Sequence, residues 1–169
     1  NCLNAGGRFS IVFLAAIANT MVMKLIAALA SGLAGAVTVT VVHEIMKRID
    51  PKAPRMDLLG MNAISKIMYK AGETPPNRRQ LFFITMAGDL IANGLYYSLA
   101  GVGYKKPWLK GTLLGTAAGV GGVLLPKPMG LNPAHSARTT PTKFMTVGLY
   151  LLGGLVTSAI VKTLQDKGL

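Results

Sequence analysis

Residues 81–102, LFFITMAGDLIANGLYYSLAGV, are the stretch that most constrains the fold of this chain. The stretch is long enough to cross a bilayer, which takes about 20 mostly apolar residues. It holds one charged residue, Asp89, near its middle. Thr85, Asp89, Asn93 and Tyr97 recur at every fourth position, so a helix places them on one polar stripe. The stretch therefore predicts a transmembrane helix and an integral membrane protein.

The composition of the whole chain agrees with this prediction. Of its 169 residues, 51% are hydrophobic and 14% are charged, whereas soluble domains carry about 25% charged residues. The net charge of +12 comes from basic residues in the segments between apolar runs. Their placement indicates contact with anionic lipid headgroups and not with nucleic acid. A chain of this length predicts one domain.

The first residues are interpreted separately from the rest. Residues 21–24, Met-Val-Met-Lys, resemble a natural start. Residues 1–20 are therefore interpreted as an upstream or non-native extension, and residues 21–169 as a single four-span membrane domain. If the extension is native, residues 9–23 form a short apolar continuation of the next helix, because about 15 residues are too few to span a bilayer alone.

Residues 25–46 predict the first membrane-spanning helix. Lys24, an apolar core and small residues also fit a cleaved secretory signal, which stays open as an alternative although the apolar run continues to Val42. Gly32 and Gly35 lie among other small residues. Small residues let two helix backbones approach closely in lipid, so we expect this helix to pack through them.

A short amphipathic helix is expected between the first and second spans. The first helix ends near Glu44 and Arg48, which are spaced for an ion pair on one helix face. Two prolines follow. Asp57 is positioned to cap a helix over residues 58–71, which is too short and too charged to span. We interpret it as an interfacial helix on the membrane surface; a cytosolic helix packed on the bundle is the alternative.

Residues 109–125 predict the third span. Gly111, Gly115 and Gly119 recur at every fourth position, with Gly122 offset beside them. Such a glycine zipper is typical of helices that pack closely in membranes, and so many glycines would weaken a helix in water. This run is therefore the strongest helix-contact signal in the chain.

The last span follows a second long connection. Residues 126–143 contain four prolines, which predict a loop without regular structure. Residues 144–164 predict the fourth helix, with Gly153 and Gly154 for close contacts. The predicted fold is all-α: a four-helix transmembrane bundle with a short interfacial amphipathic helix between the first and second spans.

The basic residues predict the orientation of these spans. Residues 47–79 contain eight Lys or Arg and residues 127–143 contain three, whereas the opposite side of the predicted bundle carries six. Cytoplasmic loops carry an excess of Lys and Arg. We therefore expect a multi-pass protein of the bacterial inner membrane, with both long loops in the cytoplasm.

Asp89 is the candidate functional residue. A charged carboxylate at mid-membrane is costly unless it is paired or protonated, by about 2.5–3.5 kcal/mol on insertion scales. One interpretation is a carboxylate that handles a cation or a proton; the other is an interhelical hydrogen bond or ion pair that fixes packing. The candidate polar cluster consists of Asp89, Asn93, Thr85, Glu44, His43, Arg138 and His135.

The remaining chemistry in the sequence is sparse. Glu44 and His43 end the first helix, and Glu44 and Asp89 are positioned to line one polar notch facing the cytoplasm, together with His135, Ser136 and Arg138. An enzyme needs a nucleophile or an acid–base pair there, and Ser136 beside His135 is only adjacency in a loop. A zinc-protease motif is incomplete, because Lys47 stands where its second histidine is required. No metal site and no cofactor are predicted.

Three segments together carry a resemblance to a family: PRMDLLGMNAI at 54–64, AGDLIANGLYYSLAG at 87–101 and SARTTPTKFMTVGLYLLGG at 136–154. In these segments the chain resembles an uncharacterised family of small bacterial integral membrane proteins with four predicted transmembrane helices. The resemblance covers roughly residues 24–164. It implies the fold and the membrane location, and it implies no activity, cofactor or catalytic residue.

Three functional hypotheses follow from the sequence. The first is a non-enzymatic helical bundle, or a small subunit of a membrane assembly, with lipid and a homo-oligomeric or membrane-complex partner. The second is a small transporter or channel component that uses Asp89. The third is a membrane enzyme with a polar site facing the cytoplasm.

Overall fold

The computed structural model describes residues 3–103 and 105–168, with side chains at residue 14 and from residue 16 onward. Within these residues all regular secondary structure is helical, which confirms the all-α class. The long helices are α1 (Leu3–Ile49), α3 (Arg78–Ser98), α4 (Pro107–Leu124) and α6 (Thr140–Asp166). The shorter α2 (Met56–Lys70) and α5 (Ala134–Ala137) lie in the two long connections.

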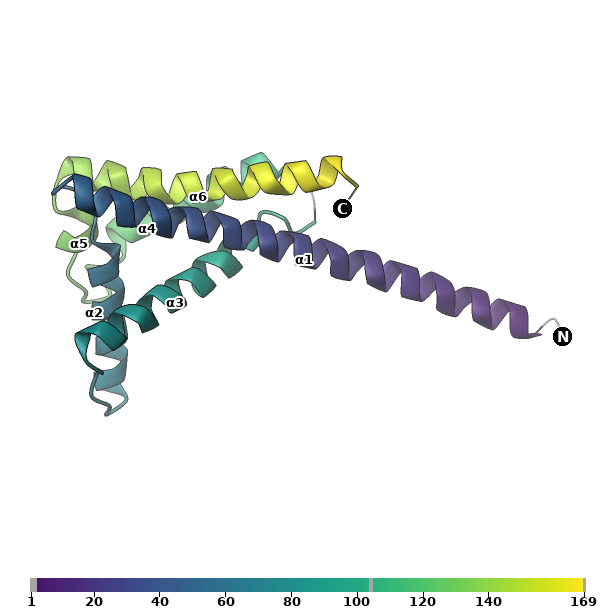
Figure 1. The fold of residues 1–169 in the computed structure, drawn as a ribbon, viewed down its shortest axis with the longest axis horizontal. Helices are drawn as coiled ribbons and strands as arrows, with labels where there is room; N and C mark the ends of the chain where they lie inside the picture. Colours follow the sequence, from purple (N-terminus) through teal and green to yellow (C-terminus); the bar gives the residue numbers. More distant parts are fainter. Residues whose placement is uncertain (1–2, 104, 169) are drawn as a thin grey trace.

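The first helix is longer than expected. α1 runs without a break from Leu3 to Ile49 instead of starting near residue 25, and it extends past the other helices at its N-terminal end (Figure 1). No proline lies in this segment, so nothing interrupts the helical hydrogen bonds. The helix therefore includes the apolar residues before Lys24, and residues 16–26 are all exposed.

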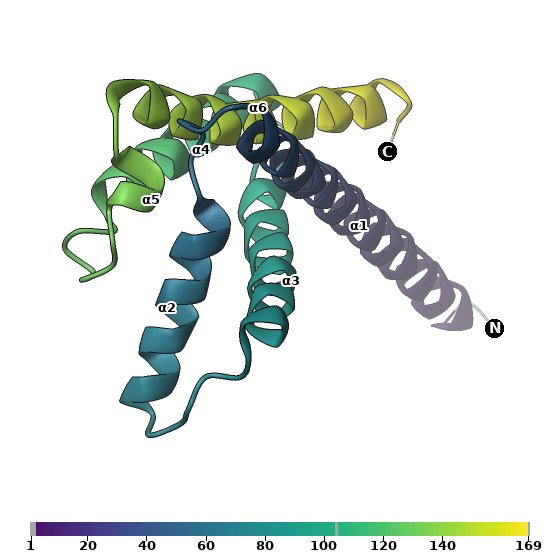
Figure 2. The same cartoon turned by 60° about the vertical axis from the view of Figure 1, so that its left-hand side comes forward.

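The long helices pack as an open row. α4 packs chiefly on α6, α6 on α1, and α1 on α3, whereas α3 and α4 make few contacts. In both views α3 diverges from α6 toward its own N-terminal end, and α2 lies beside that diverging half (Figures 1 and 2). The order α3–α1–α6–α4 therefore leaves one open edge, between α3 and α4.

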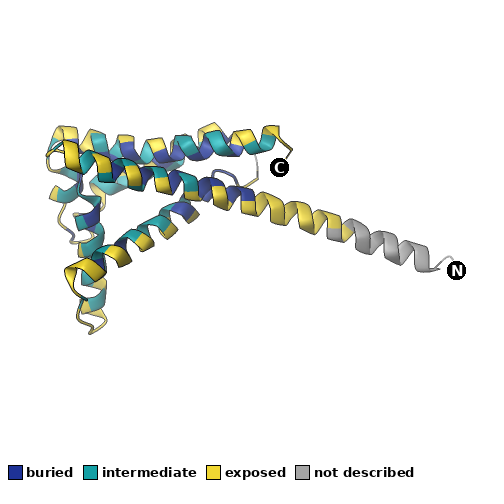
Figure 3. Ribbon diagram, viewed as in Figure 1, coloured by how far each residue is buried: buried dark blue, intermediate teal, exposed yellow. Residues whose placement is uncertain are grey.

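The packed interior consists largely of small and hydroxyl-bearing side chains. Ser31, Thr146, Thr157 and Ser158 are completely buried, and each hydroxyl donates to the carbonyl four residues earlier. Many large apolar side chains are instead exposed, and exposed residues occur along every long helix (Figure 3). By length and composition, two of the described helices are apolar enough to cross a membrane, Ala16–Ile49 and Thr140–Asp166. α3 and α4 do not pass that test.

Two local predictions are wrong for identifiable reasons. The N-cap of α2 is Arg55, without a side-chain cap, because the Asp57 carboxylate bonds to cationic side chains instead of to the helix end. The second long connection is also not irregular throughout. It contains α5, and α6 begins at Thr140. Pro133 precedes α5 and Pro141 lies in the first turn of α6, where the missing N–H costs nothing.

The two long connections lie at the same end of the row (Figure 1) and bond to one another. The Arg55 N–H donates to the His135 carbonyl at 2.6 Å. The Thr142 hydroxyl donates to the Lys52 carbonyl at 2.8 Å. These bonds hold the start of α2 and the start of α6 in one polar layer.

Candidate functional site

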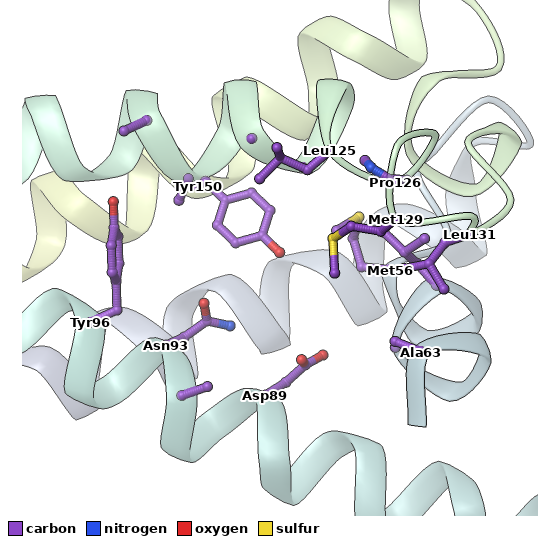
Figure 4. Close-up of a pocket in the computed structure, with 17 residues that line it drawn as sticks. Met56, Ala63, Asp89, Asn93, Tyr96, Leu125, Pro126, Met129, Leu131 and Tyr150 are labelled. Carbon is purple, nitrogen blue, oxygen red and sulfur yellow. The ribbon is translucent and has the colours of Figure 1, made fainter. Parts of the chain in front are cut away.

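A cleft of about 590 Å³ lies at the open edge, between α3 and α4. α2 forms one wall, and Tyr150 of α6 lies at its floor. Most of the lining is apolar, and Tyr96 lies at one end of it (Figure 4). Besides the backbone, the polar groups in the lining come from Asp89, Asn93, Tyr96 and Tyr150.

The polar stripe of α3 positions Asp89 in this cleft. Thr85 and Tyr97, the outer members of the stripe, are buried, and the Thr85 hydroxyl donates to its own helix at Leu81 O (2.8 Å). Asp89 and Asn93, the inner members, are half-buried and face the cleft. The four side chains therefore lie on one stripe of the helix, as predicted. In the structure this stripe faces the protein, and the middle two residues line the cleft.

Three polar side chains converge in the cleft without partners from the chain. Figure 4 shows the Asp89 carboxylate, the Asn93 amide and the Tyr150 hydroxyl pointing into the same space. Within the described residues, none of the three side chains makes a hydrogen bond or an ion pair. Native proteins leave few such groups unpaired, and each one calls for a physical explanation.

Two tyrosines fix the closed end of the cleft. The Tyr96 hydroxyl donates to Leu114 O on α4 at 3.0 Å, and the Tyr97 hydroxyl donates to Tyr150 O on α6 at 2.7 Å. Both residues lie near the C-terminal end of α3. α3 is therefore held to α4 and α6 at that end, while its N-terminal half, which carries Asp89, stands away from them.

His43 of α1 lies behind the cleft. A small cavity of about 20 Å³ is lined by His43 together with Asp89, Asn93 and Tyr150. The buried His43 Nε2 is 3.1 Å from Pro54 O and 3.2 Å from the Met56 backbone nitrogen. These contacts need opposite roles of one atom: a protonated Nε2 donates to the carbonyl, and an unprotonated one accepts from the N–H.

A second charged group, which we call the junction cluster, joins α1 to α2. It consists of Glu44, Lys47, Arg55 and Asp57. The buried Asp57 carboxylate accepts two hydrogen bonds from Arg55, each 3.0 Å long, and one from Lys47 Nζ at 3.2 Å. Lys47 Nζ is also 2.5 Å from Glu44 Oε1. Glu44 therefore pairs with Lys47, whereas the sequence predicted a pair with Arg48.

The electrostatics of the junction cluster favour an ionised Asp57. Burial alone raises the pKa of this carboxyl, but the hydrogen bonds and charges of Arg55 and Lys47 outweigh it and hold the pKa at about 2. Lys47 Nζ lies 5.3 Å from the ring centroid of Phe82 on α3, within cation–π range. The cluster therefore connects α1, α2 and α3 beside the wide end of the cleft. The sequence analysis missed it.

The predicted polar cluster is only partly brought together. Asp89, Asn93 and His43 surround one small cavity, and Thr85 lies one turn from Asp89. Arg138 instead donates to Pro51 O, and His135 lines a separate cavity along α2. Neither of these two lines the cleft. Across the described part of the chain, no group of three metal-ligating side chains is found.

The predicted packing glycines mostly lie at close helix contacts. Gly32 and Gly35 of α1 face α3 and α6, and Gly111, Gly115 and Gly119 of α4 face the α6 backbone. Gly153 faces Val39 and the Tyr97 side chain, and Gly154 faces Gly111. Gly122 is the exception: it lines the cleft, and a Cβ there would meet only ordinary contacts at 3.4 Å or more.

Comparison of the chain with protein-family models, with curated proteins and with solved structures finds no match. The resemblance of three segments to a family of small bacterial membrane proteins therefore stays a prediction. The function has to be argued from the geometry of the fold and the cleft.

Proposed function

We propose that the chain is a four-span integral membrane protein without catalytic activity, working as a helical bundle or as a small subunit of a membrane assembly. In this proposal α1, α3, α4 and α6 cross the bacterial inner membrane. α2 lies along its surface, and both long connections face the cytoplasm. The glycines of α4 act as a glycine zipper that holds α6 within the same chain.

One observation carries the membrane placement. Leu25, Leu29, Leu33, Val37, Val41 and Ile45 recur at every fourth position of α1, and all six are exposed. At 1.5 Å per residue this apolar stripe is about 30 Å long, the thickness of the hydrocarbon core of a bilayer. A soluble monomer rarely exposes a continuous apolar surface of that size, whereas lipid covers it at no cost.

The interior supports the same proposal. Small residues and hydroxyl groups fill the helix contacts, while Ile91 and Leu95 of α3, its C-cap Leu99, and Leu109 and Leu113 of α4 are exposed. This distribution is the reverse of a water-soluble bundle. It suits lipid, which supplies no hydrophobic drive between helices and leaves close packing to hold them together. It also supports placing α3 and α4 in the membrane despite their lower hydropathy.

The charges support the orientation. Lys66, Lys70, Arg78 and Arg79 lie on or next to α2, at the end of the row where both long connections meet. Basic residues at a cytoplasmic surface attract anionic headgroups, by about 1 kcal/mol each. We therefore propose that this layer rests on the inner leaflet.

Accessibility of introduced cysteines tests the placement. In a Cys2→Ser background, Lys127→Cys lies in a long connection and Lys105→Cys in the short one at the opposite end. In intact spheroplasts a membrane-impermeant maleimide is expected to label Lys105→Cys, and to label Lys127→Cys only after lysis. Release of the protein from membranes by alkaline carbonate, or labelling of both positions from the same side, would contradict the proposal.

The cleft favours a second candidate, a small transporter or channel component that uses Asp89. A cavity that reaches a carboxylate inside the row of helices is the observation that supports it. The enzyme hypothesis has less support: Glu44 pairs with Lys47, the His135 side chain lines another cavity, and Ser136 is buried. Asp89→Asn separates the first two candidates, because loss of flux in a folded protein indicates transport, whereas loss of stability indicates packing.

A further inference from the structure

We propose that the cleft between α2, α3 and α4 binds a small amphipathic organic cation, a substituted ammonium whose head contacts Asp89 and whose apolar body lies along α2 and α4. The proposal rests on the membrane placement above, because the apolar walls of the cleft are stable only away from bulk water. It goes further by naming a ligand class and its binding residues.

The polar end of the cleft matches a single positive head. Asp89 supplies one negative charge, and the Asn93 amide and the Tyr150 hydroxyl point toward the same space (Figure 4). The lining contains no Lys or Arg. The titratable group on the far side is His43, across the small cavity. A carboxylate away from bulk water favours a cationic partner, and an ammonium near tyrosine rings gains further attraction.

The apolar end of the cleft matches an organic body. Met56 and Ala63 come from α2, Leu125 ends α4, and Met129 and Leu131 come from the following connection. Methionine side chains are flexible and fit variable shapes. A volume of about 590 Å³ falls within the range of small-molecule pockets, about 300–1,000 Å³. The cleft is thus wide enough for an alkyl or aryl group beside the charged head.

A bare metal ion fits the same residues poorly. Ca²⁺ takes about six to eight oxygen ligands and Mg²⁺ about six, whereas the side chains here offer one carboxylate, one amide and phenol oxygens, of which the Tyr96 hydroxyl is engaged with Leu114 O. The methionines and leucines at the other end would contribute nothing to such an ion. Charge and shape complementarity together therefore select an organic cation over an inorganic one.

Equilibrium binding to the full chain in phosphatidylcholine nanodiscs tests the site, with hexyltrimethylammonium as the probe. This probe keeps its charge at every pH and carries one short apolar body. We expect saturable binding above that of empty nanodiscs. Asp89→Asn should weaken it about tenfold or more, because the fixed positive charge of the probe loses the attraction of the carboxylate. The matched control, Glu73→Gln, removes the same charge from an exposed connection and should leave the affinity unchanged.

Neutral hexanol distinguishes charge recognition from simple filling of an apolar groove. If hexanol binds as tightly as the ammonium probe, or if Asp89→Asn binds the probe like the native chain, the cation site is wrong. Should Asp89→Asn fail to fold, Tyr150→Phe, which removes one hydroxyl, is expected to weaken binding about threefold, and unchanged affinity in that variant would overturn the proposal.

A chain that stays in membranes after carbonate but binds no probe refutes the ligand site alone, whereas a chain released by carbonate refutes the membrane placement.

Discussion

The two faces of α4 carry the same kind of residue and meet opposite surroundings. On one face, Gly111, Gly115 and Gly119 are buried against the α6 backbone. On the side turned toward α3, Ala117, Ala118 and Gly121 line the cleft, and Gly122 lies at the border between the two, beside Thr146 and Tyr150 of α6. Small residues on α4 are therefore not enough for close packing.

The partner helix decides which face closes. α6 presents Gly154 and Ser158 to α4, so the two backbones approach closely. α3 presents Asp89, Asn93 and Tyr96 to the other face, and the Tyr96 hydroxyl bridges the gap by bonding to Leu114 O. α3 and α4 make few other contacts, and the cleft occupies the space between them. The contrast predicts different responses to substitutions that are chemically alike.

The largest effect is expected from Gly115→Ala in the α4–α6 contact. A Cβ at Gly115 would lie 2.7 Å from Tyr150 O and 2.8 Å from Leu151 Cα, both backbone atoms that have no room to move. Overpacking of this kind costs about 1–3 kcal/mol, and we expect the upper half of that range. Unfolding in detergent micelles, followed by circular dichroism, measures the loss.

The matched control for that substitution is Gly148→Ala on α6, where a Cβ meets nothing within 4 Å. It should be neutral or stabilise the helix by up to about 1 kcal/mol. Equal melting behaviour of the two variants would show that the α4–α6 backbones do not approach as closely as described.

The next effect is the acid sensitivity of the junction cluster, which holds the α2 wall of the cleft against α1. The pKa of Asp57 is lowered from 3.8 to about 2 in the folded protein, so the unfolded chain binds its proton first as the pH falls. The resulting stabilisation is complete above pH 4 to 5 and is lost as the pH falls through 4 toward 2. It amounts to about 1–2 kcal/mol, allowing for the exposure of Arg55.

Comparing the native chain with Asp57→Asn isolates this contribution, because the other carboxyl groups titrate in both proteins. The difference in unfolding free energy between them should shrink by about 1–2 kcal/mol when the pH is lowered from 5 to 2. A difference that stays constant with pH would mean that Arg55 and Lys47 do not stabilise the Asp57 carboxylate.

A smaller effect is expected from the two tyrosines that close the end of the cleft. Tyr97→Phe removes the bond to Tyr150 O from a fully buried side chain and should cost about 1 kcal/mol. Tyr96→Phe removes the bond to Leu114 O from a half-buried residue and should cost about half as much. The same unfolding measurement compares the two losses of stability. A larger loss for Tyr96→Phe would mean that the hydrogen bond between α3 and α4 contributes more than the one between α3 and α6.

Spacing along the chain predicted the faces of the helices but not their neighbours. The four-residue period of Gly111, Gly115 and Gly119 identified a packing face, and the period of Thr85, Asp89, Asn93 and Tyr97 identified a protein-facing one. Tyr150 was missed as a member of the site because it lies sixty-one positions after Asp89. The periodicity of α3 cannot predict that a residue of α6 lies opposite Asp89. That placement depends on how α3 and α6 each pack on α1, which lies between them in the row.

Local rules failed where tertiary partners were stronger. Asp57 was predicted to cap α2 but lies in its first turn, and capping depends on nearby backbone N–H groups alone. The nearby cations of Arg55 and Lys47 offer charged hydrogen bonds, which are stronger than neutral ones. Only the turn between α1 and α2 brings Lys47 within 3.2 Å of that carboxylate. Arg138 and His135 were predicted to belong to the polar cluster with Asp89. Contacts with the backbone of the first long connection hold both residues elsewhere.

The smallest effect, and the sharpest comparison with Gly115, is expected at Gly122 on the same helix. A Cβ at Gly122 would lie 3.4 Å from Thr146 Cγ2 and 3.6 Å from Tyr150 Cε2, which are ordinary contacts with side chains. Gly122→Ala should therefore change the unfolding free energy by less than about 0.5 kcal/mol, the usual limit for positions free of strain. A loss as large as that of Gly115→Ala would mean that α4 is closely packed on both faces and that the cleft beside Asp89 is closed.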